Sequence, residues 1–461
     1  MTGVPAYRMS ASPPHQFTLL RQRRFAPFFW TQFAGAANDN LFKFAFTVMV
    51  TYQLQVSWLP PALAGLVIGA LFIAPFVLFS ATSGQLCDQQ EKTRIIRAVK
   101  NLEIAIMALA ALGFLIDAPD LQAGLLLACT FLMGLHSTLF GPVKYALLPQ
   151  VLAERELVGG NALVESGTFV AILLGNLAGG LLIALPGIGR EAVAAGCLLL
   201  ALLGRWSAQR MEPLAATDPQ LRINWNPFSE TRRNLRLARE DTVSWYMLLG
   251  ISWLWFFGAV FLSQFPVLAK DVLRGSEHVA SLLLVVFSIG IGAGALLCER
   301  LSRGTVEIGL VPLGALGMSV FTLDFWLATR GLPASDPMGL SAFVAQPAHW
   351  RVLLDLALLS MSAGLFSVPM YALIQVRSQP SHRSRIIAAN NIVNALFMVA
   401  SALISAALLV AGVSLTGLFL CLALGNTLML VWLCLRVPQM LQRLGRWWQD
   451  SRLARRPGRG P

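Results

Sequence analysis

Charged and amide side chains interrupt a long apolar segment near the N-terminus. The segment runs over residues 25–52, and roughly 20 apolar residues in a helix suffice to cross the core of a bilayer. Gln32, Asp39, Asn40 and Lys43 fall on one face of that helix. Because ionisable groups at membrane depth are costly and often mark transport paths, we expect this face to bind a substrate or an ion. The alternative is a polar seam that packs helices together.

Other polar residues in apolar segments have plainer interpretations. Asp39 precedes Lys43 by four residues, the order that favours an ion pair within one helix. Asn38 falls off the face that these two residues share. His136 lies in the middle of a later apolar segment, and we expect a hydrogen-bonded packing residue there.

The composition indicates a polytopic membrane protein and excludes an ordinary soluble one. Hydrophobic residues make up 56% of the chain, charged residues only 13%, and the mean hydropathy is +0.65. The six cysteines form no CxxC or Cys/His cluster, so we expect neither a disulfide framework nor a metal site, and no cofactor. The basic N-terminal segment lacks a short apolar region with a cleavage site, so no removable signal peptide is expected.

We predict an all-α protein with twelve transmembrane helices in two six-helix halves. The expected spans are 25–52, 62–82, 95–115, 123–148, 157–185, 192–207, 243–268, 279–298, 308–328, 352–374, 386–410 and 415–436. With these spans, 27 of the 35 Lys and Arg residues fall on one side of the membrane and five on the other. Because positive charge collects on the cytoplasmic side, both termini are expected there.

The spans divide the chain into five segments. They are an N-terminal tail (1–24), a first six-helix half (25–207), a basic linker (208–242), a second half (243–436) and an Arg/Trp-rich tail (437–461). The linker is expected to hold a helix capped near Ser229 that lies on the lipid surface, and the C-terminal tail to behave alike. Topology and anionic lipid already account for these basic segments, so no nucleic-acid partner is expected.

The two halves resemble each other in sequence. Asn161 and Glu165 match Asn390 and Asn394 at a constant offset of 229 residues. The runs that precede them, residues 140–148 and 366–374, are also similar. A duplicated six-helix unit with a site between the halves is typical of major facilitator transporters.

The loop after the second span supports that resemblance. It is similar to the superfamily signature G-x-L-x-D-R-x-G-R-[RK], from which it departs at Gln89, Glu91 and Thr93. The resemblance implies a cytoplasmic gate loop with Asp88 helping to lock that face; the loop residues are Gly84, Asp88, Lys92 and Arg94. A solvated loop charge at Asp88 is the alternative.

Three stretches carry a narrower resemblance: residues 31–43, residues 141–149 with 161–165, and residues 387–391. The chain resembles the bacterial lysophospholipid transporter family, especially the transporter portion of transporter–acyltransferase fusion proteins. The resemblance implies inward movement of lysophospholipids such as 2-acyl-glycerophosphoethanolamine across the bacterial inner membrane for reacylation. It also implies a separate acyltransferase/acyl-carrier-protein synthetase as a partner. The residues implied in headgroup recognition or gating are Asp39, Asn40, Lys144 and Glu165, and the wider candidate set adds Lys43, Asn161, Asn390 and Asn394.

The residues make this substrate chemically reasonable. A zwitterionic headgroup needs an acceptor and a donor, which Asp39, Glu165 and Lys144 supply. Lys144 near the end of the fourth span and Glu165 about two turns into the fifth lie at similar depth, so we expect them to pair. Small residues at four-residue spacing are expected to allow close helix packing, namely Gly175, Gly179, Gly290 and Gly294.

Other functions stay open at this point. A proton- or sodium-coupled exporter of drugs or small metabolites has the same fold, and Asp39 would then be its coupling site. An embedded acyltransferase would need an H-x4-D arrangement, and none of the five His residues has an Asp five positions later. A non-transporting membrane sensor does not need charges at the midplane and is the weakest alternative.

Overall fold

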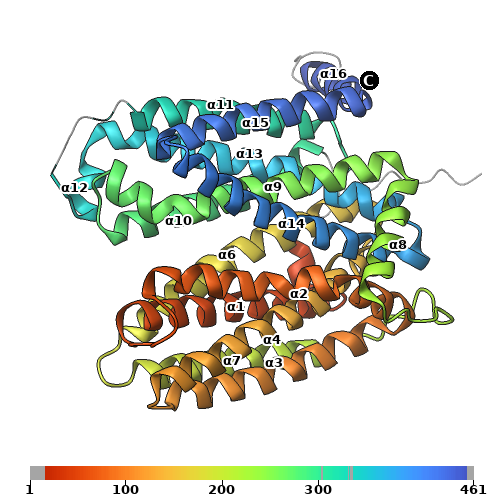
Figure 1. Cartoon of the computed structure of the whole chain (residues 1–461). Helices are drawn as coiled ribbons and strands as arrows, with labels where there is room; N and C mark the ends of the chain where they lie inside the picture. The colour runs from red at the N-terminus through yellow and green to blue at the C-terminus, as the bar shows by residue number, and fades with distance from the viewer. Residues whose placement is uncertain (1–15, 303–304, 331, 333–335, 454–461) are drawn as a thin grey trace, which may run out of the picture.

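The computed structural model describes residues 16–302, 305–330, 332 and 336–453, and it is a bundle of long helices that run side by side (Figure 1). The long helices are α1 (Ala26–Tyr52), α2 (Pro61–Gln89), α3 (Lys92–Leu115), α4 (Pro119–Ala146), α6 (Leu157–Ile183), α7 (Gly189–Gln209), α9 (Thr242–Val267), α10 (Glu277–Ser302), α11 (Leu310–Arg330), α13 (Pro347–Arg377), α14 (Arg383–Val410) and α15 (Leu415–Arg436). Each overlaps one predicted span. Several run past the predicted limits, because polar residues that flank an apolar core still continue the helical hydrogen bonds.

Within the described residues, eleven of these helices are long and apolar enough to cross a membrane, and α1 is not among them. Its length of 27 residues is sufficient. Its hydropathy is lowered by the polar face that includes Gln32, Asp39 and Lys43. This polar face is covered by neighbouring helices, since Gln32 contacts Thr168 of α6, Asp39 contacts Ser137 of α4 and Lys43 contacts Phe72 of α2.

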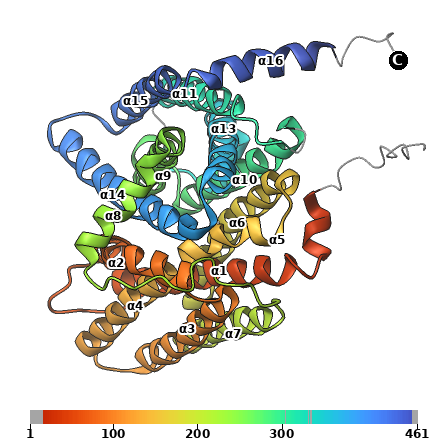
Figure 2. The same cartoon turned by 90° about the vertical axis from the view of Figure 1, so that its right-hand side faces the viewer.

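The helices form two groups that meet along one interface. Helices α1–α7 lie together in one group and α9–α15 in the other (Figures 1 and 2). Across the interface α2 packs against α14 and α6 against α10. Helices α3 and α7 lie on the far side of the first group, and α11 and α15 on the far side of the second (Figure 2). Polar residues on α1, α2, α4, α6, α13 and α14 therefore lie nearer to the interface than those on the outer helices.

The segment between the two groups crosses one end of the bundle, which we call the linker end. Helix α8 (Pro227–Glu240) lies there (Figure 1). Its N-cap is Asn226, whose side chain accepts from the amides of Phe228 and Ser229, so the predicted cap near Ser229 was wrong by three residues. Asn226, and not Ser229, caps the helix because Pro227 occupies the first helical position, where no backbone N–H is needed. The shorter elements are η1 (Gln16–Arg21), α5 (Leu148–Val151), η2 (Glu154–Glu156), η3 (Leu268–Val272), α12 (Leu340–Ala345), η4 (Pro380–His382) and α16 (Gln439–Leu453).

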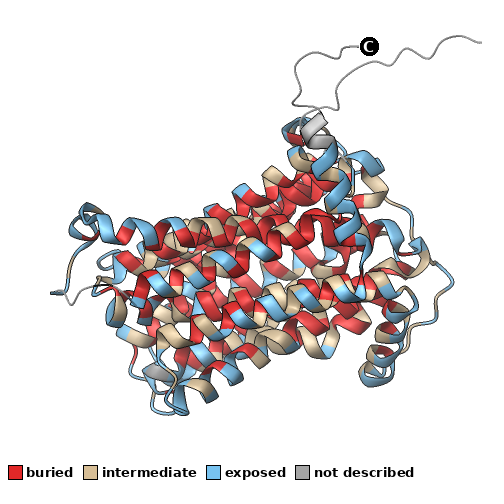
Figure 3. Cartoon of the chain, turned by 90° about the horizontal axis from the view of Figure 1, so that it is seen from above, coloured by how far each residue is buried: buried red, intermediate tan, exposed pale blue. Residues whose placement is uncertain are grey.

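Glycines hold two pairs of helices at close range, as their spacing predicted. A Cβ atom at Gly175 or Gly179 on α6 would collide with backbone oxygens of α1. A Cβ atom at Gly294 on α10 would collide with the carbonyl of Met361 on α13. Buried residues fill the interior and exposed residues gather at the ends and outer faces (Figure 3). Leu66, Leu181, Leu403 and Leu428 are among the exposed apolar side chains, as a lipid solvent favours.

Candidate functional site

Asp39 and Lys43 lie one turn apart on α1 but contact different helices. The Ser137 hydroxyl of α4 donates to Asp39 Oδ2 at 2.6 Å, while Asp39 Oδ1 is buried with no hydrogen-bond partner among the described residues. The Lys43 ammonium lies 3.8 Å from the centroid of the Phe72 ring on α2. The predicted ion pair between the two was therefore wrong, because a cation–π contact and a hydroxyl donor on neighbouring helices take its place. Asn40, on the same face, donates to the Ala36 carbonyl of its own helix at 2.8 Å.

Lys144 and Glu165 lie close to one another without pairing directly. Lys144 Nζ donates to Thr168 Oγ1 at 2.8 Å, and the hydroxyl of Tyr145 donates to Glu165 Oε1 at 2.5 Å. No ion pair joins Lys144 to Glu165 in the residues that the structure describes. Successive residues of a helix point about 100° apart, so Tyr145 and Lys144 reach different turns of α6. The predicted ion pair between Lys144 and Glu165 was therefore wrong. Two adjacent hydrogen bonds between α4 and α6 take its place.

Contacts across the interface between the two groups lie beside these residues. The rings of Tyr145 on α4 and Tyr371 on α13 stack with centroids 4.4 Å apart and planes 4° apart. Asn161 on α6 and Gln375 on α13 exchange two amide hydrogen bonds of 2.7 and 3.0 Å. The sequence placed Asn161 in the candidate site but not Gln375, because no motif singles out a lone amide on a partner helix.

Asn390 and Asn394 occupy the corresponding positions of the second group. The side-chain amide of Asn394 on α14 donates to the Ser252 hydroxyl of α9 at 2.8 Å. Asn390 is buried, and its Oδ1 has no hydrogen-bond partner among the described residues. The indole of Trp255 donates to the Tyr371 hydroxyl at 3.4 Å. The second group therefore contributes amides and hydroxyls where the first contributes charges.

A buried charged cluster within the first group was missed at the sequence level. Lys100 and Glu103 on α3 form an ion pair of 2.6 Å, and both side chains are almost fully buried. Asn38 donates to Glu103 Oε1 at 2.8 Å, and His136 Nε2 lies 3.4 Å from Glu103 Oε2. The spacing of Lys100 and Glu103 inside an apolar segment is the signal that identifies the pair.

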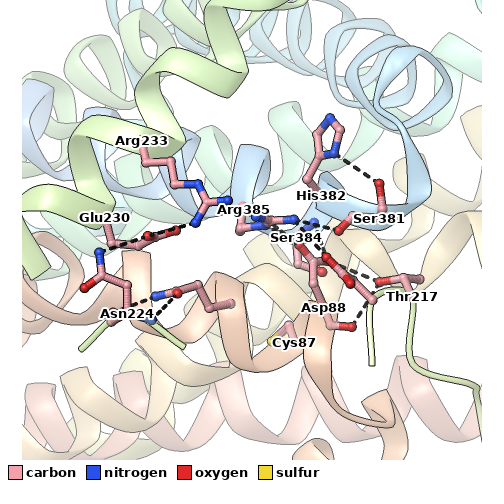
Figure 4. A network of polar contacts seen from close by, with 12 residues as sticks. Cys87, Asp88, Thr217, Asn224, Glu230, Arg233, Ser381, His382, Ser384 and Arg385 are labelled. Atoms are coloured by element: carbon pink, nitrogen blue, oxygen red, sulfur yellow. Dashed lines mark hydrogen bonds and ion pairs between the residues drawn. The ribbon is translucent and has the colours of Figure 1, made fainter. Parts of the chain in front are cut away.

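The predicted gate loop joins the two groups at the linker end (Figure 4). Asp88 is fully buried and accepts from the Arg385 guanidinium at 3.1 Å and from the Ser384 amide at 3.1 Å. Arg385 also contacts Asp218 of the linker at 3.4 Å. Asp88 is thus an inter-group contact and not a solvated loop charge. Arg385 and Asp218 could not be found from the loop signature, which covers only their partner.

The other residues of the gate loop differ in their surroundings. Gly84 lets α2 approach α14, since a Cβ atom there would lie 2.7 Å from the Cβ of Ala388. Lys92 is buried and donates to the Cys87 carbonyl at 3.3 Å. Arg94 is exposed. The structure therefore places Gly84 and Asp88 in the last turns of α2, at the interface, and Lys92 and Arg94 in the first turn of α3. The expected loop is thus shorter than the sequence predicted, because α2 continues to Gln89.

The interior thus holds carboxylates, ammonium groups and amides at membrane depth, with a closed contact at one end. Within the part of the chain that the structure describes, no three His, Cys, Asp or Glu side chains gather as a metal ion would require. The profile of the Major Facilitator Superfamily matches residues 28–402.

The chain belongs to the major facilitator superfamily. It is a multi-pass membrane transporter and not an enzyme, as its sequence predicted.

Relatives of the chain include lysophospholipid transporters. It is 26% identical over 355 residues to the lysophospholipid transporter LplT of Serratia proteamaculans (strain 568), with 76% of this chain and 79% of that protein covered. The LplT of Yersinia pestis (strain Pestoides F) is also 26% identical over 355 residues, with 76% and 78% covered.

Solved structures share the fold at low sequence identity. The human organic anion transporter MFSD10 (TETRAN) matches with a TM-score of 0.67 and 13% identity, covering 91% of this chain and 100% of that one. The major facilitator transporter FucP in its outward conformation matches with a TM-score of 0.63 and 13% identity, covering 90% of this chain and 99% of that one. Similarity at this identity concerns the fold alone.

Proposed function

We propose that this transporter moves lysophospholipids, such as 2-acyl-glycerophosphoethanolamine, inward across the bacterial inner membrane. The observation that carries the proposal is the separation of Asp39 from Lys43. Both lie on the same face of α1, yet Asp39 keeps one free carboxylate oxygen and Lys43 lies on the Phe72 ring. A zwitterionic headgroup offers an ammonium to the first and a phosphate to the second. The relationship to the LplT proteins supports the same substrate class.

An apolar cavity supports accommodation of the acyl chain. It has a volume of about 420 Å³ and lies between α9, α14 and α15. Its lining includes Trp253, Phe256, Phe397 and Leu422. Phe397 lies one turn along α14 from Asn394, a polar position of the candidate site. Apolar walls beside a few polar groups suit an amphiphile with one chain.

The charge distribution supports the orientation. Twenty-seven Lys and Arg residues on one side favour a cytoplasmic linker end, with both termini there as well. The Asp88–Arg385 contact would then close the cytoplasmic side, leaving the opposite side to receive substrate from the outer leaflet. On the cytoplasmic side, an acyltransferase/acyl-carrier-protein synthetase would add the second acyl chain.

A flipping assay in proteoliposomes tests the proposal. The purified full chain is reconstituted, and fluorescent lysophosphatidylethanolamine, lysophosphatidylglycerol, lysophosphatidylcholine and diacyl phosphatidylethanolamine are compared. We expect the single-chain lipids to move and the diacyl lipid not to. Asp39→Asn should keep its expression and lose about tenfold in rate, the effect of about 1.4 kcal/mol of lost substrate stabilisation.

The matched control is Asp117→Asn, because Asp117 is an exposed carboxylate that contacts only Arg190 among its described ion-pair partners. It should flip lysophospholipid at the normal rate. A wild-type protein that moves no lysophospholipid would overturn the proposed substrate. Normal flipping by Asp39→Asn would mean that the polar face of α1 only packs against other helices.

A further inference from the structure

The N-terminal segment contacts both helix groups at the linker end. Its first described element, η1 (Gln16–Arg21), packs against α1 and α6 of the first group. The side-chain amide of Gln16 donates to the Leu296 carbonyl of α10, in the second group, at 3.1 Å. Gln16 is only 2% exposed, so this hydrogen bond between the groups is shielded from water. We call residues 16–25 the strap.

The base of the strap is bound to the first group. The Arg24 guanidinium donates to the two carboxylate oxygens of Glu156 at 2.9 and 2.6 Å and to the Val151 carbonyl at 2.7 Å. Glu156 directly precedes α6, and Val151 is the last residue of α5. Because a bidentate ion pair is stronger than a single amide hydrogen bond, the strap should remain with the first group when the groups part. The bond between Gln16 and Leu296 must then break.

A glycine allows the strap, α6 and α10 to meet at one point. A Cβ atom at Gly159, near the start of α6, would lie 3.0 Å from the Cβ of Gln16 and 3.0 Å from Glu299 Oε1 of α10. Since carbon atoms pack at about 3.5–4.0 Å, a side chain there would push the strap or α10 away. The neighbouring residues Val158 of α6 and Cys298 of α10 are fully buried members of one apolar cluster. The strap thus lies beside a close contact between α6 and α10.

The strap lies on the opposite side of the bundle from the Asp88–Arg385 contact. Seen from the linker end, the start of the described chain (red) lies beside α6, whereas α2, α8 and α14 lie on the other side (Figure 2). An ion pair joins α2 to α14, and the strap joins the first group to α10. A rocking motion that opens the linker end must break both contacts, because each of them joins the same two groups.

We propose that the strap is a second latch of the linker end, holding α6 against α10 while the Asp88–Arg385 contact holds α2 against α14. A neutral hydrogen bond stabilises the closed arrangement only modestly, since water replaces it on opening. The acceptor oxygen of the same side chain, Gln16 Oε1, is buried with no hydrogen-bond partner among the described residues, which offsets part of the gain. The latch therefore favours closure and still opens during transport. The inference concerns the opening of the bundle and does not rest on the proposed substrate.

Maleimide labelling of native cysteines in the purified full chain tests the latch. Three buried thiols report on different places: Cys298 on the contact between α6 and α10, Cys87 on the α2 side of the linker end, and Cys129 inside the first group. Gln16→Glu keeps the size of the side chain but replaces the donor with an acceptor, so the bond to Leu296 is lost. We expect Cys298 and Cys87 to react at least about fivefold faster than in the wild type, and Cys129 at an unchanged rate. Peptide mass spectrometry quantifies each thiol separately.

The three thiols distinguish a latch from other effects of the substitution. A strap that only covers α6 locally would expose Cys298 alone, so an unchanged rate at Cys87 would overturn the proposal. Gln16→Ala removes the same hydrogen bond without adding a charge, and it should accelerate the same two thiols. Equal acceleration of all three thiols, Cys129 included, in both variants would assign the strap to general stability and would also overturn the proposal.

Thr18→Ala is the matched control within the strap. Thr18 lies on η1, two residues from Gln16, and its side chain is exposed. This variant should label all three cysteines at the wild-type rates. Acceleration of Cys298 and Cys87 by Thr18→Ala to the same extent as by Gln16→Ala would show that the bond to Leu296 is not what holds the linker end closed.

Discussion

Tyr145 and Tyr371 stack on one another and also occupy matching positions in the two halves of the sequence. Their ring centroids are 4.4 Å apart, and the residues lie in the similar runs 140–148 and 366–374. Equivalent residues of a duplicated unit meet each other only near the axis that relates the two copies. The stack therefore marks this axis, and relative rocking of the two helix groups must slide or separate the rings.

The tyrosine stack should contribute measurable coupling energy. In a double-mutant cycle of Tyr145→Ala and Tyr371→Ala, we expect a coupling of about 0.5–1.5 kcal/mol in the free energy of unfolding, as for other aromatic pairs. Denaturant titration of the purified protein in detergent measures it. Tyr145→Phe in place of Tyr145→Ala should retain the coupling, because only the hydrogen bond to Glu165 is lost. Strictly additive effects would mean that the rings contribute nothing to each other.

Closure of the linker end should depend on the missing side chain at Gly84. In Gly84→Ala the added methyl group meets Ala388 at 2.7 Å and Arg385 Cα at 3.0 Å, so α2 and α14 must separate at a cost of about 1–3 kcal/mol. The native thiol of Cys87, buried beside Asp88, should then react faster with maleimide, as quantified by peptide mass spectrometry.

Gly69→Ala is the control within the same helix, because a Cβ atom at Gly69 meets nothing within 4 Å. It should leave the labelling rate of Cys87 unchanged. Equal labelling in both alanine variants would show that close packing at Gly84 does not hold the linker end closed.

Lys144 and Glu165 should behave as balanced charges although they do not touch. Lys144→Met or Glu165→Gln alone leaves one charge in the interior without its opposite, at a cost of several kcal/mol. We expect the double variant to unfold at a higher temperature than the less stable single variant, yet to flip lysophospholipid poorly. Thermal unfolding in detergent and the proteoliposome assay measure the two effects. A double variant less stable than both singles would assign each charge a separate partner.

The ion pair between Asp241 and Arg377 predicts a specific pH dependence. The guanidinium donates to both carboxylate oxygens at 2.6 and 2.7 Å, which lowers the pKa of Asp241 to about 2. Because unfolded Asp titrates near about 3.9, the charge stabilises the fold above about pH 4, and this contribution is lost as the pH falls towards 2.

Asp241→Asn isolates this charge, because an asparagine can still cap α9 through the Ser244 amide. The half-exposed pair contributes at most about 1 kcal/mol. We expect the difference in unfolding free energy from the wild type to be constant between pH 5 and 8 and smaller at pH 3. A difference that grows from pH 5 to 8 would contradict this assignment.

The sequence predicted the helices well and their side-chain partners poorly, for a physical reason. Hydropathy and Lys/Arg placement act along the chain, so all twelve long helices overlap predicted spans. Which side chains contact each other, in contrast, depends on how the helices pack. Lys43 contacts Phe72 of α2 and not Asp39 of its own helix, and Glu165 accepts from Tyr145 and not from Lys144, the residue before it on α4. Both outcomes depend on how the helices are rotated against each other.

The sequence identified structural roles best for candidate residues that belong to a recognisable motif. Asp88 was singled out by its loop signature and lies in a contact between the groups. Glu103 belongs to no motif, and its importance follows only from the convergence of Lys100, Asn38 and His136 upon it. Convergence of this kind depends on how three helices are rotated against each other, which hydropathy does not encode.

The linker segment at residues 214–224 is hydrogen-bonded to the first helix group, so the two groups contribute different numbers of elements to the contact between them. Its amides at Thr217 and Asp218 donate to the Asp88 carbonyl, and its Asn224 exchanges two hydrogen bonds with Gln85, so it is fastened to α2. When the groups part, the bonds that the Arg385 side chain and the Ser384 amide of α14 make to Asp88 have to break. The carboxylates of Asp88 and Asp218 then stay together on the first helix group, while the Arg385 guanidinium moves away with the second. Reclosure therefore needs no loop to refold, because Arg385 and the first amides of α14 return to carboxylates that have stayed in place.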